Sequence, residues 1–569
     1  MNVSSTEAVA GPGAEELPPA APFPGFREGE SVTLPPGVLS VFRPGDERLR
    51  WRLDFHYPRG IVPLGHELLG SVNRASQEAA EALPVATGRG LVGRLVGPHL
   101  YTAGIPVDEE QVAGRAAASS AEIASYPDRF LDEWTTAATA LAAAHRNLDG
   151  QLRAADDLHT LGTLFRRANT VFAEAWRLHF DVMYRLLAVT ASFRTVCAAV
   201  GIAPDEVSRL LPSGDTTVRR TDRRLWRLSR AATEEGLTEV FREHTGAQLL
   251  AAVRSDPRAT AWLASFDQFV NRFGTRSDQV ADVGAPSWLE APECPLELVR
   301  QMVLDGGDPT RAAEAQSRRQ DDRLAELRAR MSPRDRGAFD RSYAWCRRGN
   351  FTWWNEEHNT HIDLRAHLPV RTVGRAVATA SGGRPDDGVL LYAGELRALC
   401  VGDIGWADVS GLLVARAEHL AAWRRRRGSL PRAVGTASRQ IDPLMAEIIG
   451  SEPDTPGLSG PALLHGVPAS AGIARGPVRR VSDVSELDRL APGDVLVCEA
   501  TSPSWTPAFP RLAACLCDSG GALTHAAIVC REYGVPCVCA LGVAMQTLRD
   551  GDLVEVDGLA GTVTVLRRA

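Results

Sequence analysis

The sequence contains no lysine, so all 63 of its basic residues are arginine. Phosphate-binding loops and many other nucleotide sites use a lysine to hold a phosphate group, and such sites cannot be built here in their usual form. The sequence also has no Gly-x-x-x-x-Gly-Lys motif, and no Gly-x-Gly-x-x-Gly motif in a convincing context. We therefore expect no tightly bound cofactor and no ATP site of the usual kind within this chain.

Excess positive charge and long apolar runs are also missing. The net charge is -7, which argues against a nucleic acid or an anionic membrane surface as the main partner. No apolar run approaches the length of a membrane span, and the N-terminus lacks the basic-then-apolar order of a secretory signal. We expect a cytoplasmic protein that binds neither nucleic acid nor membrane.

The ten cysteines are scattered or lie in short apolar runs. Cys515 and Cys517 are two residues apart, as are Cys537 and Cys539, so each pair would share one face of a strand. A metal site is one interpretation of such pairs. Buried free thiols in a cytosolic protein are the interpretation that we favour, and we expect no metal site.

A chain of 569 residues is too long for one hydrophobic core and suggests several domains. Its composition changes along the chain in a way that separates them. We expect a disordered lead-in (1–28), a small strand-containing segment (29–107), a helical central and linking region (108–450), a Pro/Gly-rich linker (451–462) and a compact C-terminal domain (463–569).

The C-terminal domain contains the stretch around which the function is argued. Arg511 to Cys517 is a short apolar run that predicts a buried strand, and a Gly-Gly turn follows it. Thr524 stands in the N-cap position of a helix whose first turn contains His525, and Gly534 is placed to end that helix. The sequence therefore predicts a strand, a turn and a helix, followed by a second strand.

A helix N-terminus attracts anions and disfavours imidazolium, so His525 should stay neutral, as a nucleophile must. A phosphoryl group on His525 could be held by the unpaired N–H groups at the helix N-terminus, the Thr524 hydroxyl and the Arg531 guanidinium. The alternative is a histidine that only packs or caps at the start of a helix.

From Gly520 the sequence runs Gly-Gly-x-x-Thr-His-Ala-Ala-Ile-Val-x-Arg-Glu-Tyr-Gly-Val-Pro. This order resembles the phosphohistidine signature of phosphoenolpyruvate-utilising enzymes. Further blocks of that resemblance surround it: 466–478, 492–497, 501–507 and 550–558. The resemblance implies a multidomain α+β protein with a mainly helical central region and a C-terminal β/β/α swivelling domain. It also implies that His525 is phosphorylated in turnover, with Gly520 and Gly521 as cofactor-binding residues.

A second block resembles the central region of rifampicin phosphotransferase. It runs from Phe273 through Gly274-Thr275-Arg276 to Asp282 and Pro286-Ser-Trp-Leu-Glu-Ala-Pro. An acidic residue is usual in this family where Gln279 or Val280 stands here, so no acid–base role is expected at that position. Arg276 could meet a phosphoryl oxygen or pair with a nearby aspartate, and Asp282 is a second substrate-binding candidate.

Two stretches are candidates for the site of the phosphoryl acceptor. Asp54 and His56 lie two apart, so on an extended segment they would share a face and could act as orienter and general base. A surface pair beside packed aromatic residues is the alternative. The second stretch, on a predicted helix, contains the binding candidates Trp353, Trp354 and Glu356, with His358 as a possible base.

The resemblance implies a phosphotransferase component that works with a separate ATP-grasp subunit, as the histidine-carrying subunit of phenylphosphate synthase does. ATP, with Mg²⁺, would charge His525 through this partner, and the acceptor would be a small-molecule hydroxyl. A phosphorylation-driven dehydratase or condensing enzyme of a biosynthetic pathway is the second interpretation. A non-catalytic binding module with a relic histidine domain is the third.

Overall fold

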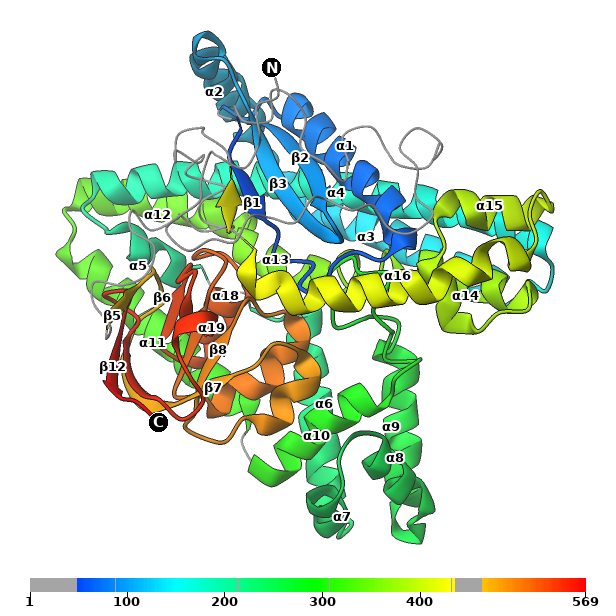
Figure 1. Ribbon diagram of the computed structural model, residues 1–569. Helices are drawn as coiled ribbons and strands as arrows, with labels where there is room; N and C mark the ends of the chain where they lie inside the picture. The colour runs from blue at the N-terminus through cyan, green and yellow to red at the C-terminus, as the bar shows by residue number, and fades with distance from the viewer. Residues whose placement is uncertain (1–48, 87, 212–213, 306–307, 431, 435–462) are drawn as a thin grey trace. The chain divides into compact units, whose positions relative to one another are not determined.

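The computed structural model describes residues 49–86, 88–211, 214–305, 308–430, 432–434 and 463–569. The predicted lead-in and linker lie outside these residues. The chain is a multidomain α+β protein with a mainly helical central region and a C-terminal β domain, as predicted (Figure 1). It forms two compact units, each assembled from separate stretches of the chain: Met1–Ala188, Gln279–Ala285 and His361–Gln440 in the first, and Val189–Asp278, Pro286–Thr360 and Ile441–Ala569 in the second.

Within the described residues of the first unit, four strands form an antiparallel sheet in the order β2-β3-β1-β4. The Gly-x-Gly-x-x-Gly sequence that starts at Gly88 lies inside β2 rather than in a turn that opens a helix, so it is not a nucleotide loop. The sheet packs Trp51 and Tyr101 against Trp423 of helix α16. The strands are β1 (Trp51–Leu53), β2 (Gly88–Val96), β3 (His99–Pro106) and β4 (Ala433–Val434).

Helices make up the rest of the first unit, and α1 covers strand β2 (Figure 1). They are α1 (His66–Ala82), α2 (Glu109–Ile123), α3 (Tyr126–Ala154), α14 (Leu368–Ala380), α15 (Ala393–Val401), α16 (Trp406–Arg426), the 3-10 helices η2 (Pro63–Gly65), η4 (Pro385–Leu390) and η5 (Arg427–Ser429), and most of α4 (Leu158–Ala199).

Helix α4 is long and apolar enough to cross a membrane by length and composition, with a mean hydropathy of 1.2 over its most apolar window. No run of this kind was expected from the sequence. Half of that window is buried inside the protein, as in the core helix of a water-soluble domain, so the helix is weak evidence for a membrane span.

The second unit joins a helical body to the C-terminal domain through one continuous core. Apolar side chains such as Phe266 and Trp262 belong to the same buried cluster as Phe509 and Val529 of the C-terminal domain. The helices of the body are α5 (Pro204–Arg209), α6 (Thr217–Glu234), α7 (Thr238–Glu243), α8 (Gly246–Ser255), η3 (Pro257–Ala259), α9 (Thr260–Phe273), α10 (Glu293–Asp305), α11 (Pro309–Arg330), α12 (Pro333–Arg348) and α13 (Phe351–Asn359).

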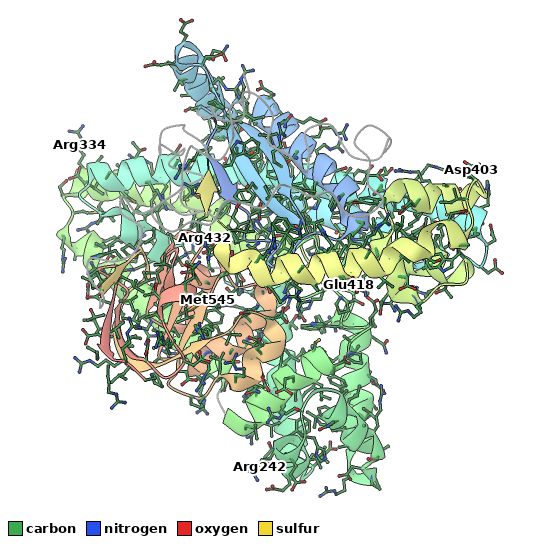
Figure 2. All side chains as sticks on the ribbon, in the orientation of Figure 1. Arg242, Arg334, Asp403, Glu418, Arg432 and Met545 are labelled. Atoms are coloured by element: carbon green, nitrogen blue, oxygen red, sulfur yellow. The ribbon has the colours of Figure 1, made fainter. Side chains whose placement is uncertain are left out.

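Charged side chains at helix ends, such as Arg242 and Arg334, are exposed to solvent (Figure 2).

The described residues of the C-terminal domain form a mixed sheet in the order β5-β12-β11-β7-β8-β9-β10-β6, with β7 to β10 parallel. Helix α18 packs on β6, β9 and β10. The elements are β5 (Leu463–His465), β6 (Val467–Ser470), β7 (Ile473–Arg480), η6 (Val484–Arg489), β8 (Val495–Cys498), η7 (Pro503–Arg511), β9 (Ala514–Cys517), α18 (His525–Tyr533), β10 (Cys537–Cys539), α19 (Ala544–Thr547), β11 (Leu553–Asp557) and β12 (Thr562–Arg567).

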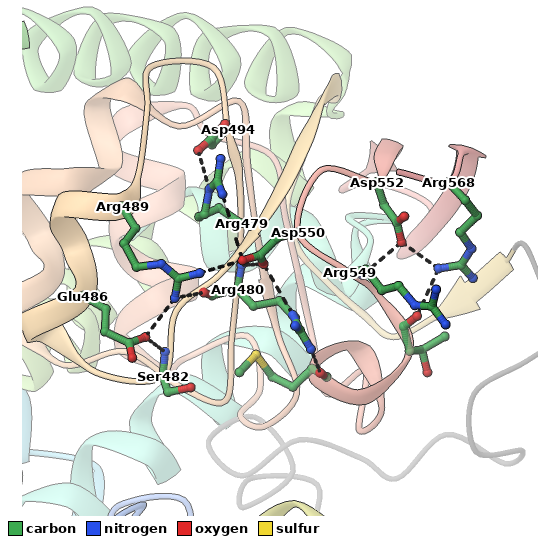
Figure 3. A network of polar contacts seen from close by, with 12 residues as sticks. Arg479, Arg480, Ser482, Glu486, Arg489, Asp494, Arg549, Asp550, Asp552 and Arg568 are labelled. Carbon is green, nitrogen blue, oxygen red and sulfur yellow. Dashed lines mark hydrogen bonds and ion pairs between the residues drawn. The ribbon is translucent and has the colours of Figure 1, made fainter.

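Acidic residues of the 550–558 block bind arginines of β7, of η6 and of the segment after β12 (Figure 3). Asp550 accepts hydrogen bonds from the backbone N–H of Arg480 at 2.9 Å and from Arg489 Nη2 at 2.6 Å. Asp552, which is fully buried, accepts from Arg568 Nη1 at 2.7 Å. These contacts give the block a structural role that is separate from the chemistry at His525.

Candidate active site

His525 is the first residue of α18, and Thr524 before it is the N-cap residue. The strand, turn, helix and strand around it are as predicted, except that the first strand begins at Ala514, because Arg511 still belongs to the 3-10 helix η7. Thr524 makes no capping bond with its side chain. Its hydroxyl donates instead to the carbonyl oxygen of Gly521 at 2.7 Å, which closes the turn ahead of the helix.

Two glycines make this short helix possible. Gly534 ends α18 with φ +70°, the left-handed conformation that glycine adopts without strain. Gly520 has φ +92°, and a Cβ atom there would lie 2.8 Å from the methyl carbon of Thr524. The turn therefore requires glycine at position 520, whatever it binds.

Two threonine hydroxyls hold the imidazole of His525. Thr506 Oγ1 donates its hydrogen to the carbonyl oxygen of Pro503 at 2.8 Å, so it accepts the hydrogen bond from His525 Nε2 at 3.1 Å. A neutral imidazole has one N–H, and Nδ1 must then be the acceptor. Thr501 Oγ1 donates to Nδ1 at 2.9 Å. These contacts select the Nε2–H tautomer.

The imidazole is closed off from solvent in this arrangement. His525 is 8% exposed, and the ring of Phe509 packs edge-on against it at 6.0 Å. Burial lowers the pKa of His525 to about 3, so the ring is neutral at physiological pH. Neutrality was expected from the helix N-terminus, and the structure supplies burial as its cause. Neither nitrogen can meet a phosphoryl donor until the ring is uncovered.

Arg531 lies two turns further along α18 and is also buried, with 5% exposure. Its Nη1 donates to the carbonyl oxygens of Ala469 at 2.9 Å and Ala522 at 2.7 Å. Arg531 therefore holds the glycine turn from behind, while its Nη2 has no hydrogen-bond partner among the described residues.

A group of buried or half-buried charged residues surrounds the other end of α18, and we call it the inner polar cluster: Arg219, Asp222, Arg276, Glu356 and Glu532. Arg219 of α6 binds Glu532 of α18 through Nη2 at 2.8 Å and Nε at 3.1 Å, both to Oε2. Glu356 of α13 is 2% exposed, and its Oε1 lacks a hydrogen-bond partner within the described part of the chain. Burial and the nearby charge of Glu532 raise the pKa of Glu356 well above its usual value.

Arg276 and Asp222 complete the cluster. The guanidinium of Arg276 stacks on the Trp288 ring at 3.9 Å, and burial lowers its pKa to about 10. Asp222 is 4% exposed, and burial raises its pKa to about 7 although Arg276 and Arg219 favour its ionised form. The charges of Asp222 and Asp278 favour the ionised form of Arg276, although no ion pair joins Arg276 to Asp278 in the described residues.

The pKa of Asp222 leads to a stability prediction. The pKa of Asp222 is 3.8 in the unfolded chain and about 7 in the folded protein. The stability that Asp222 contributes is therefore complete below pH 3.8 and is lost as the pH rises from there to about 7. Asp222→Asn should therefore raise the free energy of unfolding, and by roughly 2 to 3 kcal/mol more at pH 8 than at pH 5. Urea denaturation at both pH values measures this difference. Asp267→Asn, at an exposed position on α9, is the control, and an equal effect at both pH values would contradict the prediction.

The aromatic candidates on α13 differ in their surroundings. Trp354 is fully buried, and His358 stacks on it with 4.2 Å between ring centroids and donates from Nδ1 to the Trp354 carbonyl oxygen at 3.0 Å. Trp353 donates from Nε1 to the carbonyl oxygen of Asp215 at 3.3 Å. Packing thus accounts for Trp354, and one nitrogen of the buried His358 is already occupied.

Asp54 and His56 form a close pair in the first unit. Asp54 Oδ1 accepts from His56 Nδ1 at 2.7 Å and from the His56 backbone N–H at 2.8 Å. The pair lies in the loop after β1 rather than on an extended strand, so the turn, not a shared strand face, brings the side chains together. Burial lowers the pKa of His56, but the charge and hydrogen bond of Asp54 outweigh it and raise the pKa above its ordinary value.

The rest of this site is acidic. The His56 side chain is 39% exposed, and its Nε2 makes no hydrogen bond to any residue that the structure describes. Asp282 and Asp363 are buried, and together with burial their charges raise the pKa of Tyr57. Asp282 Oδ1 accepts from the backbone N–H of Gly284 at 2.7 Å. The geometry is that of an oriented imidazole with one nitrogen open to a ligand.

The structure thus collects the predicted residues into two sets. Arg276, Glu356 and Arg531 belong to the second unit with His525, and Asp54, His56 and Asp282 belong to the first. Residues that the sequence did not single out are Thr501, Thr506, Arg219 and Asp222. The two threonines lie within the 501–507 block that resembles the family. Their place in that block was the signal in the sequence that could have identified them.

Comparison with known proteins agrees with this geometry. Residues 490–561 match the mobile domain of PEP-utilising enzymes, and residues 180–356 match the fourth domain of rifampicin phosphotransferase. The first match contains the threonines and His525. The second contains Arg219, Asp222, Arg276 and Glu356, so the inner polar cluster joins the two matched domains.

Several curated proteins are similar to the chain. Chondramide synthase cmdD of Chondromyces crocatus is 29% identical over 95% of this chain, and the uncharacterised phosphotransferase YvkC of Bacillus subtilis is 27% identical over 75% of it. Phosphoenolpyruvate synthase of Pseudomonas aeruginosa is 43% identical over 18% of the chain. The matched parts make up 14%, 51% and 13% of these relatives, so the chain spans about half of YvkC and a small part of the others. Two regions of the chain therefore belong to the phosphoenolpyruvate-utilising enzyme superfamily, one as its mobile domain and one as a domain of the rifampicin phosphotransferase type.

Proposed function

We propose that the chain carries a phosphoryl group on His525 to the hydroxyl of a small-molecule acceptor. The observation that supports this most is the neutral imidazole at the start of α18, held by Thr501 and Thr506 inside the region that matches the mobile domain. ATP, with Mg²⁺, is the proposed phosphoryl source, supplied through a separate ATP-grasp subunit in the cytoplasm.

The transfer has two steps. First, a ring nitrogen of His525 attacks the phosphorus of the donor, an N–P bond forms and the P–O bond to the leaving group breaks. The acceptor oxygen then attacks phosphorus and the N–P bond breaks. Each step requires the ring to exchange a threonine hydroxyl for phosphorus. Because Thr501 and Thr506 belong to the same matched domain as His525, the imidazole itself must turn away from them to react.

His56 is the proposed base in the second step. Asp54 orients its Nδ1–H, and Nε2 can take the proton of the acceptor hydroxyl. The raised pKa of His56 favours accepting that proton. His358 is a weaker candidate because its ring is buried and stacked on Trp354. In the inner polar cluster, Arg276 and Glu356 are the proposed ligands for phosphoryl or acceptor oxygens.

The direct test is phosphorylation of the chain. The purified protein is incubated with labelled ATP, Mg²⁺ and each candidate ATP-grasp protein, and its intact mass is measured. We expect one added phosphoryl group that is lost in acid and retained in base, and peptide mapping should locate it at His525. A stable adduct on serine or threonine, or no adduct with any donor, would contradict the proposal.

The similarity to a protein named chondramide synthase favours a second candidate function in biosynthesis. In that reaction the phosphorylated hydroxyl leaves as phosphate. If a base removes a neighbouring proton, an alkene forms; if a nucleophilic group of a second substrate attacks the carbon instead, a coupled product forms. Product mass separates the two functions: the first product keeps the phosphate, and the second has lost water or gained a second substrate.

A further inference from the structure

Six of the ten cysteines gather in the core of the C-terminal domain, under the helix that begins with His525. We call them the thiol cluster: Cys498, Cys515, Cys517, Cys530, Cys537 and Cys539. Each is at most 1% exposed, and none forms a disulfide. The remaining four cysteines lie elsewhere in the chain.

Strand geometry places five of these thiols on one face of the sheet. Successive side chains of a strand alternate between faces, so Cys515 and Cys517 point to one side and Leu516 to the other. In the parallel register, Cys498 of β8 is opposite Cys517 of β9, and Cys515 is opposite Cys537 of β10. Helix α18 covers this face and adds Cys530.

The sulfur atoms are at distances that suit a shared metal ion. The Sγ atoms of Cys498 and Cys517 are 3.6 Å apart, and those of Cys515 and Cys517 are 3.8 Å apart. A tetrahedral thiolate site with Zn–S bonds of about 2.3 Å has sulfurs about 3.8 Å apart. Two triads, Cys498 with Cys515 and Cys517, and Cys515 with Cys530 and Cys537, each have all their sulfurs within 4.8 Å of one another.

A buried cation next to the cluster supplies the second observation. The guanidinium of Arg531 is 5% exposed, and its Nη2 has no hydrogen-bond partner among the residues described. Arg531 directly follows Cys530 in α18, so this buried cation lies beside the cluster. The net negative charge of thiolates bound to a metal ion would stabilise it there.

We propose that the thiol cluster binds a soft metal ion of the Zn²⁺ or Cu⁺ class, with Cys515 as the ligand shared by both triads. Thiolates are the ligands that select these ions. Binding replaces the S–H protons of the coordinating cysteines with metal–sulfur bonds, and the protons pass to solvent without any redox change. Because Cys530 belongs to α18, the ion would fasten the His525 helix to strands β8, β9 and β10. This site does not depend on the proposed phosphoryl transfer.

The test measures the metal content of the full chain. Protein is produced with added Zn²⁺, or with Cu⁺ under anaerobic conditions, desalted and analysed by elemental mass spectrometry and native mass spectrometry. We expect at least one ion per chain, and loss of most of it in Cys515→Ala and Cys537→Ala. Cys346→Ala, which removes an equally buried thiol from α12, should keep the metal.

A second measurement distinguishes metal-bound thiols from free thiols and disulfides. In the wild-type chain, a thiol reagent in denaturant should titrate all ten cysteines only after a chelator is added. Ten reactive thiols and no metal after either preparation would overturn the proposal and indicate a packed core of neutral thiols. Fewer than ten thiols without metal would overturn it in favour of disulfides, and unchanged metal in Cys515→Ala would also overturn it.

Discussion

His525→Ala is expected to form no acid-labile phosphoryl adduct and to lose transfer activity by at least about a thousandfold. The variant removes the only proposed nucleophile, and no other group can take over a covalent step that requires a ring nitrogen. Intact mass after incubation with the phosphoryl donor measures the first effect, and acceptor turnover measures the second.

His465→Ala provides the matched control, because it removes an exposed histidine from the same domain. It should keep both the adduct and the activity. Thr506→Val tests the tautomer: loss of the Nε2 hydroxyl contact should change the rate of charging but not the site of the adduct. Full activity in His525→Ala would show that this domain plays no chemical part and would favour the relic-domain interpretation.

His56→Gln is expected to lower the rate of transfer to the acceptor by about 10²- to 10⁴-fold, the usual contribution of a general base. Asp54→Asn should give a smaller loss in the same step, because the amide still orients the ring but no longer stabilises the imidazolium. The rate of acceptor phosphorylation from pre-charged protein isolates this step from charging.

Charging of His525 should be unchanged in both variants, since neither residue takes part in the first step. His159→Gln, at an exposed position on α4, is the control for loss of a histidine in the same unit. Equal losses of charging and transfer would indicate that the Asp54–His56 pair is structural. An unchanged transfer rate would remove His56 from the mechanism.

The local structure around His525 could be predicted because its signals are short-range. The glycine turn, the N-cap position of Thr524 and the left-handed Gly534 each depend on a few neighbouring residues. The C-terminal fold followed from a resemblance spread over several blocks, and the match to residues 490–561 confirms it.

Long-range contacts could not be predicted in this way. Arg219 and Glu532 are 313 positions apart, and no local pattern marks either as the partner of the other. Asp222 looks like an ordinary polar residue in an arginine-rich helix until the fold buries it. Thr501 and Thr506 lie inside the 501–507 block, but the direction of their hydroxyl groups depends on how η7 packs against α18.

Helix α18 has only nine residues and is held at both of its ends. At one end the imidazole of His525 is bound by two hydroxyls, and at the other Glu532 is bound by a guanidinium from α6. The two hydroxyls belong to the same domain as α18, whereas the guanidinium belongs to the helical body. If the C-terminal domain departs from that body, water must therefore solvate the Glu532 carboxylate and the Arg219 guanidinium, while His525 keeps its threonine partners.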